Sequence, residues 1–378
     1  MHVDPHTCTA YYTQTSHSSI FSTPMDPMLP PTANYTYRNF RFNPSFAIDD
    51  RKTPRAFWFE QYQNPNTAGD NGYSLQLMSA DLKDLNGRTS VLSRICHSHQ
   101  GELIVDPSSG DVIFQSTGAT STSGVQHYCY RSAGAKSSTL FYRNSASYRA
   151  TNIAVDWKTR LLYVSGTNAN AIRKVSIDAK NPDSNKEVVV ATNTSANAMG
   201  IAGDTLYYVQ VSSYGQRRFQ SSVLYSCKPG SGRHLGNNGS RSVRSGGRDG
   251  NPCNAQHATN LSGIPHAFSD QFSTIGLIAE SDASLVFSSR RGNSVARALS
   301  RYDVQAKTWE EIHVTPFSNP VALGAGTDPS SKKKRLHFID GTFSTFGSFT
   351  PLAEGEPGPF NVPFEISGSF VALSKLGT

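Results

Sequence analysis

The sequence is poor in charged residues and lacks long apolar runs. Charged residues make up 17% of the chain, against roughly a quarter in typical soluble proteins. No stretch of about 18 apolar residues occurs, so we expect no membrane-spanning helix and no membrane partner. The N-terminal stretch MHVDPHTCTAYYTQ lacks the apolar core of a signal peptide. The low charge and abundant Ser, Thr, Asn and Gly instead favour a loop-rich β protein.

Motifs with a defined chemistry are also absent. The sequence contains no G-x-S-x-G elbow, no H-E-x-x-H helix, no P-loop and no EF-hand loop. The five cysteines form no C-x-x-C pair. These absences argue against the hydrolase, zinc, nucleotide and calcium classes that such motifs define, and we predict no cofactor.

The chain is basic, but its positive charge is not gathered into a nucleic-acid motif. The net charge is +7 and the pI is about 9.1. The only run of four basic residues is KKKR at 332–335, in a predicted turn, where a solvated surface is the ordinary interpretation. Nucleic-acid binding requires basic side chains interleaved with aromatic ones on one face. We therefore predict no nucleic-acid partner, and no feature indicates an oligomeric state.

Glycosylation sequons and the cysteine count favour an oxidising compartment. Sequons begin at Asn34, Asn193, Asn238 and Asn260. Cysteine spacing allows Cys227 to pair with Cys253 and Cys96 with Cys129, which would leave Cys8 over, although connectivity cannot be deduced from sequence. We predict a secreted protein or one of the secretory-vesicle lumen.

The clearest structural pattern covers residues 152–178, NIAVDWKTRLLYVSGTNANAIRKVSID. It reads as three β-strands separated by a turn at 157–160 and a loop at 166–170. A fourth strand is predicted at 186–191, after the turn signal Asn-Pro-Asp. Four antiparallel strands in about forty residues are typical of one propeller blade.

The short apolar sequence of the first strand in this blade occurs six times along the chain. Its copies are FAID, LIVD, IAVD, MGIA, IGLI and VALG, beginning at residues 46, 103, 153, 199, 275 and 321. Spacings near 40–50 residues indicate propeller blades, and the one longer spacing predicts an insertion at 229–262. We therefore predict an all-β, six-bladed propeller over residues 45–378. Residues 1–44 are expected to form an N-terminal segment whose strand closes the last blade.

The candidate site lies where the loops entering the first strands meet the loops between the second and third strands. Both loop sets share one face of a propeller, over the axis, and ligands commonly bind at such concave sites. The loops carry aromatic, polar and basic side chains suited to one small organic ligand bearing oxygen. The predicted catalytic residues, which would polarise an oxygen, are His97, Arg149, Arg217, His266 and Arg290. The predicted ligand-binding residues are Tyr62, Tyr148, Tyr214, Phe268 and Asn197.

A metal ion on the axis is the weaker alternative. Glu102, Asn152 and Asn197 stand just before predicted first strands, and carboxylate and amide oxygens are ligands for Ca²⁺. Calcium-dependent lactonase propellers look similar there. No matching Asp occurs in the last two predicted blades, so we predict that no metal is bound.

The phrase IAVDWKTRLLYVSG…IRKVSID resembles the six-bladed propellers of the YWTD, NHL and strictosidine-synthase-like (SMP-30-like) superfamily. The resemblance covers about residues 45–373 and is sharpest at 153–178. Among such single-domain propellers, the chain looks most like the secreted fungal kind in its domain size, expected secretion and mixed aromatic and basic rim. That kind includes hetero-Diels–Alderases, which join a tropolone quinone methide to a terpene alkene. That resemblance implies a metal-independent enzyme of secondary metabolism with its ligand in the axial pocket.

Two functions without catalysis compete with this prediction. Six-bladed fungal fucose lectins bind a sugar between successive blades through recurring Arg, Glu and Trp. Here Trp58, Trp157 and Trp309 fall at non-equivalent blade positions, and no Arg–Glu pair recurs. A protein-interaction propeller is the second alternative.

Overall fold

The structure is a computed structural model, and it describes the strands and short turns of the chain. The longest segments outside the described residues are 25–31, 37–45, 64–72, 118–125, 228–257, 261–276, 350–359 and 366–378. Side chains are described mainly between Phe46 and Cys227. No helix long and apolar enough to cross a membrane occurs in this described part.

The described strands form seven four-stranded antiparallel sheets, each built from four consecutive strands. The first two sheets comprise β1 (His2–Asp4), β2 (Thr9–Gln14), β3 (Ser19–Pro24), β4 (Thr32–Thr36), β5 (Phe46–Ile48), β6 (Arg55–Gln63), β7 (Tyr73–Asp81) and β8 (Asp84–Ser93). The next two comprise β9 (Gln100–Val105), β10 (Val112–Thr117), β11 (Gln126–Arg131), β12 (Thr139–Arg143), β13 (Ala150–Asp156), β14 (Leu161–Gly166), β15 (Ala171–Ser176) and β16 (Val188–Thr192).

The remaining three sheets follow the same plan. They comprise β17 (Ala198–Ala202), β18 (Thr205–Tyr214), β19 (Phe219–Cys227), β20 (Ala258–Asn260), β21 (Leu277–Ser281), β22 (Ser284–Arg290), β23 (Arg297–Asp303), β24 (Thr308–Val314), β25 (Pro320–Thr327), β26 (Lys334–Asp340), β27 (Thr345–Phe349) and β28 (Phe360–Glu365). The strand β20 lies inside the segment that the sequence predicts as an insertion.

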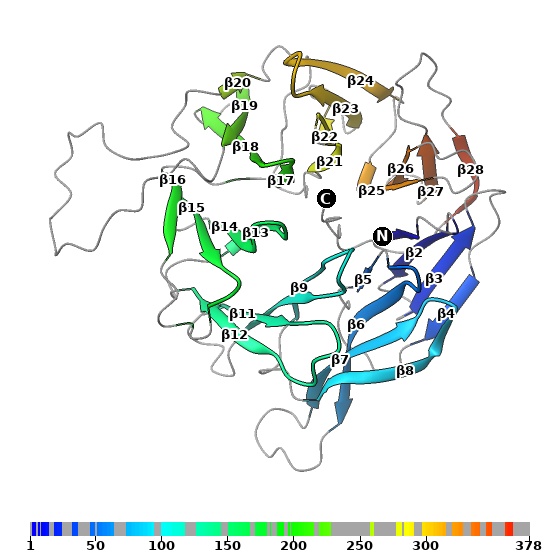
Figure 1. The fold of residues 1–378 in the computed structure, drawn as a ribbon. Coiled ribbons are helices and arrows are strands. Elements are labelled where there is room, and N and C mark those ends of the chain that lie inside the picture. Colours follow the sequence, from blue (N-terminus) through cyan, green and yellow to red (C-terminus); the bar gives the residue numbers. More distant parts are fainter. Residues whose placement is uncertain are drawn as a thin grey trace, which may run out of the picture.

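The sheets are arranged around a ring with their first strands innermost (Figure 1). First strands of neighbouring sheets contact one another in five places, β1 with β5, β5 with β9, β13 with β17, β17 with β21 and β21 with β25. β1 also contacts β25, so the first and last sheets meet and close the ring. A closed ring leaves no long sheet edge exposed.

The predicted blade count is wrong by one sheet. The N-terminal segment does not supply one strand to the last sheet but forms the separate sheet β1–β4. Its side chains Tyr11 and Ile20 pack in one apolar cluster with Phe46, Ile48 and Trp58 of the next sheet. The sequence hid this sheet because its first strand, HVD, is short and lacks the apolar phrase of the others.

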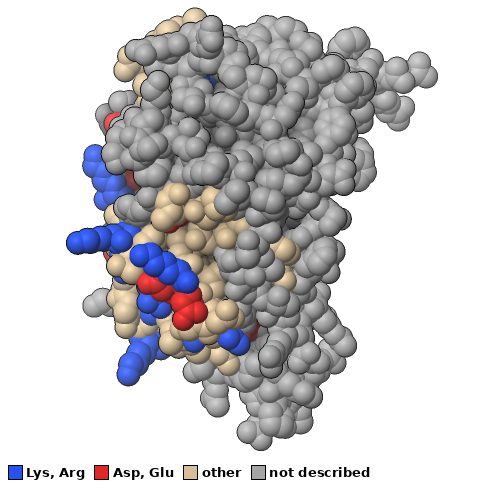
Figure 2. All heavy atoms as spheres, turned by 90° about the vertical axis from the view of Figure 1, so that its right-hand side faces the viewer, with Lys and Arg blue, Asp and Glu red and all other residues tan. Residues whose placement is uncertain are grey.

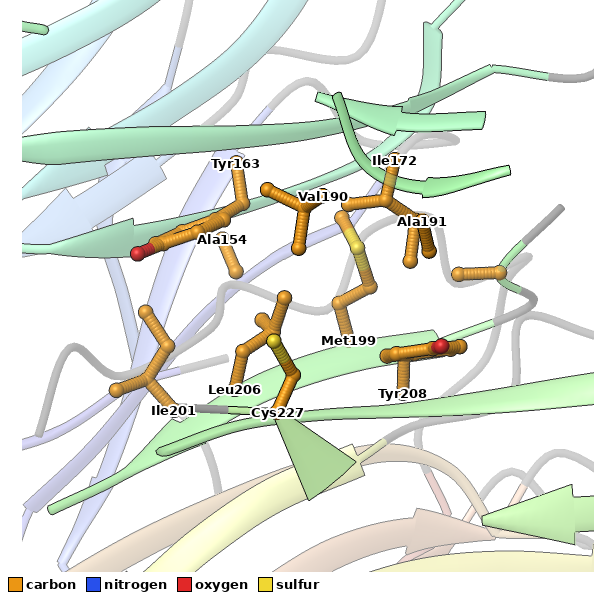
Figure 3. Close-up of a cluster of buried hydrophobic side chains, with 11 residues drawn as sticks. Ala154, Tyr163, Ile172, Val190, Ala191, Met199, Ile201, Leu206, Tyr208 and Cys227 are labelled. Carbon is orange, nitrogen blue, oxygen red and sulfur yellow. The ribbon is translucent and has the colours of Figure 1, made fainter. Parts of the chain in front are cut away.

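Apolar side chains between successive sheets form the core. One cluster joins β5–β8 to β9–β12, and a second joins β9–β12 to β13–β16. In a third, Tyr163 and Ile172 face Leu206 and Tyr208 across the space between two sheets (Figure 3). The three sheets from β5 to β16 therefore bury apolar side chains against both neighbours, which explains why their first strands read as continuous apolar runs.

The cysteines partly follow the prediction. Cys227, at the end of β19, is disulfide-bonded, but its partner lies outside the described residues, so the pairing with Cys253 stays a prediction. Cys129 is buried and carries no disulfide, so the predicted pairing with Cys96 is wrong. Cys129 lies in the cluster between β5–β8 and β9–β12, where a thiol packs as a small apolar group.

Candidate functional site

The antiparallel strands give the ring two different faces. In each sheet the first strand begins, and the second strand ends, at the same edge. We call the side of the ring formed by these edges the loop face. At the opposite edge the first strand turns into the second, and we call that side the turn face. The predicted site residues thus belong to the loop face, and the turns between first and second strands belong to the turn face.

The backbone places five of the predicted site residues at the loop-face ends of strands. Tyr62, Tyr214 and Arg290 lie at or next to the ends of β6, β18 and β22, whereas Glu102 and Asn152 lie near the starts of β9 and β13. The other predicted residues lie outside the described residues; they are His97, Tyr148, Arg149, Asn197, Arg217, His266 and Phe268.

Two hairpins project beyond the others at the loop face. Among the described pairings, β6 pairs with β5 at residues 56–58, whereas its residues 59–63 pair with β7. Residues 210–214 of β18 likewise pair with β19 beyond the described part of β17. At about 3.4 Å per residue, each hairpin extends roughly 17 Å past the described part of its first strand. In contrast, β14 ends at Gly166, which still pairs with β13.

The projecting hairpins lie on opposite sides of the axis. Their sheets, β5–β8 and β17–β20, are separated along the ring by the two lower sheets β9–β12 and β13–β16 (Figure 1). The loop face is therefore asymmetric, with two raised sides that each carry a predicted tyrosine near the hairpin tip.

The side chain of Asn152 has a structural partner. Its Nδ2 donates to the carbonyl oxygen of Ala196 at 3.0 Å, and the buried Oγ of Ser165 accepts from the Ala196 N–H at 2.9 Å. These bonds hold the segment that enters β17. Among the described residues no group of His, Cys, Asp and Glu is arranged to hold a metal ion, and the side chains of Glu102 and Asn197 lie outside them.

His127 is a loop-face histidine that the sequence analysis missed. It lies near the start of β11, half-buried, opposite Arg143 in the strand register. Burial lowers its pKa, and the positive charge of Arg143 lowers it further, so the imidazole is neutral at neutral pH and keeps an acceptor nitrogen. The sequence could have indicated this residue, because His127 directly follows the predicted loop between the second and third strands, which belongs to the loop face.

Beside His127, a side-chain pair closes the base of the β11–β12 hairpin. Asn144 Oδ1 accepts from the backbone N–H of Gln126 at 2.5 Å, and Asn144 Nδ2 donates to Gln126 Oε1 at 2.6 Å. The Asn144 N–H also donates to the Gln126 carbonyl at 3.0 Å. This edge of the loop face is thus fixed by its own hydrogen bonds, which provides a rigid support for His127.

At the turn face, an aspartate ends the first strand in three sheets. Asp106 Oδ1 accepts from the Ser108 N–H at 3.0 Å, and Asp156 Oδ1 accepts from the Thr159 N–H at 3.0 Å. Asp49 Oδ1 accepts from the Arg55 N–H at 2.9 Å. Such bonds satisfy turn amides that the sheet leaves unpaired. The repeated Asp is therefore a structural element of the blade phrase.

A network around Asp111 joins two sheets at the turn face. Tyr130 Oη donates to Asp111 Oδ2 at 2.5 Å, and the Ala133 N–H donates to Oδ1 at 2.8 Å. Arg160, from the next sheet, lies 3.6 Å from Asp111 Oδ2, and its guanidinium carbon is 4.9 Å from the Tyr130 ring centroid. Its Nε donates to Asp178 Oδ1 at 2.6 Å.

Arg160 makes these contacts from an unfavourable backbone conformation. Its φ is 55°, in the region that favours glycine, and Gly110 takes the same position in the preceding sheet with φ 75°. Burial lowers the Arg160 pKa, but its interactions with Asp178 and Tyr130 outweigh burial and leave the pKa raised. The contacts between sheets thus offset a local strain of about 1 kcal/mol.

We expect Arg160→Gly to be more stable than Arg160→Ala, although both lose the contacts between sheets. Glycine relieves the positive φ whereas alanine retains it, which predicts a difference of about 1 kcal/mol in the free energy of unfolding. Denaturant unfolding measures it. Lys307 has the same φ in an exposed turn, so Lys307→Gly should not destabilise the protein. Equal stability of the two Arg160 variants would contradict the strain.

Comparisons with known proteins identify the scaffold. No family model matches the sequence, and no curated protein matches it. Among solved structures, a putative 6-phosphogluconolactonase from Bacteroides uniformis matches over 93% of both chains, with 10% identity and a TM-score of 0.53. A puromycin hydrolase matches with 8% identity and a TM-score of 0.52, over 88% of this chain and 48% of its own.

A prolyl endopeptidase matches with 8% identity and a TM-score of 0.52, over 94% of this chain and 50% of its own. This chain therefore spans about half the length of the hydrolase and endopeptidase chains. At such low identity the likeness shows the fold alone. The chain is an all-β protein with a β-propeller scaffold.

Proposed function

We propose that this β-propeller binds one small organic ligand on its loop face, between the two projecting hairpins. The observation that carries the proposal is the inequality of the described strands. β6–β7 and β18–β19 extend five residues beyond the described part of their first strands, whereas the described part of β14 stops level with β13. Unequal hairpins shape one asymmetric site, whereas a repeated site between blades requires equal ones.

The residue types at this face suit an aromatic ligand that carries oxygen. Tyr62 and Tyr214 lie near the tips of the two hairpins, and aromatic rings there would stack on a planar ligand. Arg290 ends β22, and a guanidinium donates strong hydrogen bonds to a polarised oxygen. His127, neutral and half-buried, adds an acceptor. His97, Arg149, Arg217 and His266 remain predicted members of the site.

The finer proposal is a hetero-Diels–Alder reaction of secondary metabolism. It is supported by the resemblance of residues 153–178 to the YWTD, NHL and strictosidine-synthase-like propellers. The likeness to the secreted fungal enzymes rests on domain size, expected secretion and the mixture of aromatic and basic residues in the predicted loops. The cycloaddition of a tropolone-type quinone methide to a terpene alkene requires two partners held in contact and hydrogen bonds to a carbonyl. It requires no cofactor.

The test is binding of tropolone and of monosaccharides, including L-fucose, by calorimetry. We expect one tropolone site per chain. Tyr62→Ala and Tyr214→Ala should each weaken binding about tenfold, which equals about 1.4 kcal/mol. Lys52→Ala, an exposed change on the turn face, is the matched control and should bind like the wild type.

Other outcomes separate the alternatives. Several equivalent sugar sites per chain would establish a lectin and end the proposal. Binding of a protein partner alone would end both small-molecule interpretations. For the finer proposal, the quinone methide and alkene are incubated with the wild type and with Arg290→Met. An adduct formed at the uncatalysed rate would refute catalysis while leaving the binding proposal intact.

A further inference from the structure

Arg131 is a buried arginine with no ion pair in the described part of the chain. It ends β11 at the turn face and is 5% exposed. Its Nε is buried and has no hydrogen-bond partner among the described residues. The charge of Asp111 acts on Arg131 without forming an ion pair. A buried charge is costly unless it is paired and hydrogen-bonded, so an anion bound beside Arg131 would stabilise it.

The nearest carboxylates are occupied by other groups. Asp111 bonds Tyr130 and Ala133 and lies next to Arg160. Asp49 accepts from the Arg51 side chain at 2.8 Å and from the Arg55 N–H. These two aspartates thus bind the turns and neighbouring cations, and neither forms an ion pair with Arg131.

Two further arginines lie beside Arg131. The Arg51 guanidinium packs on the turn between β9 and β10, so closely that a Cβ built on Gly110 would lie 2.7 Å from Arg51 Cζ. Arg55 Nε donates to Ser79 Oγ at 2.9 Å. Burial lowers the Arg131 pKa, and the charges of Arg55 and Arg51 lower it further, while Asp111 opposes them. The three guanidinium groups therefore lie close enough for their charges to act on one another.

We propose that Arg51, Arg55 and Arg131 form a binding site for an oxyanion of the phosphate type, on the turn face between the β5–β8 and β9–β12 sheets. Guanidinium groups bind phosphate oxygens through paired hydrogen bonds. The site lies on the opposite face from the proposed ligand site and does not depend on it. On the face drawn in Figure 2, described Lys and Arg side chains lie toward the left edge, with Asp and Glu among them.

The geometry around Gly110 helps to form this site. Gly110 has φ 75°, and its lack of a Cβ lets Arg51 approach the turn. The Arg51 guanidinium is thereby held at the boundary between the two sheets, against Gly110, which directly precedes Asp111 in the sequence. A larger residue at position 110 would displace Arg51, so the glycine serves both the turn and the cluster.

The experiment compares unfolding temperatures in sodium phosphate and in sodium chloride at equal ionic strength. Phosphate also stabilises proteins by exclusion from their surface, so the informative quantity is the shift of the wild type minus that of Arg131→Met. We expect a positive difference, because an anion that binds only the folded state stabilises it. In chloride, Arg131→Met should be at least as stable as the wild type, since it removes a buried charge that has no ion pair.

Direct titration with inorganic phosphate, and in parallel with glycerol 3-phosphate, distinguishes free phosphate from a phosphomonoester. Arg131→Met should bind each at least about tenfold more weakly. Lys52→Met, which removes an exposed positive charge from the same turn region, is the matched control and should bind as the wild type does. Equal losses in the two variants, or no binding by the wild type, would overturn the proposal.

Discussion

Replacement of Asp111 by alanine is expected to destabilise the protein by about 3–5 kcal/mol. The carboxylate accepts from Tyr130 Oη and the Ala133 N–H and lies 3.6 Å from Arg160. Its loss leaves two donors without an acceptor, and it removes the only negative charge identified as acting on Arg131. Leaving such groups buried and unpaired costs more than the hydrogen bonds themselves contribute.

Two variants separate this effect from a general loss of charge. Asp111→Asn keeps the shape and one acceptor oxygen, so we expect a smaller loss. Asp84→Ala removes an exposed turn carboxylate whose Oδ1 accepts from the Gly87 N–H at 3.0 Å, and surface changes of this kind usually cost little. Denaturant unfolding of the three variants measures the differences. A loss below about 1 kcal/mol for Asp111→Ala would show that solvent or nearby groups replace the carboxylate.

The inner strands were predictable because they are buried on both faces. That burial selects apolar residues in a continuous run, and the runs beginning at residues 46, 103 and 153 fall within β5, β9 and β13. The first strand of the β1–β4 sheet has only three residues, of which two are polar. This strand lacks the continuous apolar run of the other first strands, including the equally short β5, so the seventh sheet emerged only from its pairing and packing.

The candidate site was predictable in position but not in shape. Strand order fixes which loops share a face, and that topology places Tyr62, Tyr214 and Arg290 at loop-face ends. How far a hairpin projects depends on strand register. It is the number of second-strand residues that pair with the third strand beyond the last residue that pairs with the first strand. Sequence spacing indicates a long loop but does not show that residues 59–63 continue as a paired hairpin.

The turn-face network escaped the sequence analysis for a different reason. The repeated Asp in FAID, LIVD and IAVD is visible in the sequence, but its role depends on the turn amides and hydroxyls that it contacts. Likewise, Arg131 and Arg51 are 80 positions apart in sequence, and only the packing of neighbouring sheets brings them together. Charge clusters built across sheets leave no local pattern.

Alkaline conditions should unfold this protein steeply from about pH 10 upward. Burial, followed by the negative charges of Asp4 and Asp81, raises the pKa of Tyr11 to about 12. Burial also raises the pKa values of Tyr163 and Tyr208. Between the unfolded pKa of about 10 and the folded pKa, the unfolded chain has lost a proton that the folded chain retains. The unfolded state binds fewer protons, so stability falls as the pH rises.

Tyr11→Phe tests the part that Tyr11 contributes to this loss of stability. Phenylalanine fills nearly the same space at the boundary between the β1–β4 and β5–β8 sheets and cannot ionise. At neutral pH the variant should be close to the wild type in stability. At pH 12 the wild type should have lost up to about 2.7 kcal/mol more, since two pKa units correspond to twice about 1.36 kcal/mol.

Chemical unfolding at a series of pH values, with phenolate absorbance followed in parallel, gives the measurement. Lysine deprotonation and the other tyrosines affect both proteins equally, so the difference between the two curves isolates Tyr11. If the curves run parallel from pH 9 to pH 12, Tyr11 ionises alike in both states. It would then be accessible to water, and the β1–β4 sheet would not be packed against β5–β8 as the structure has it.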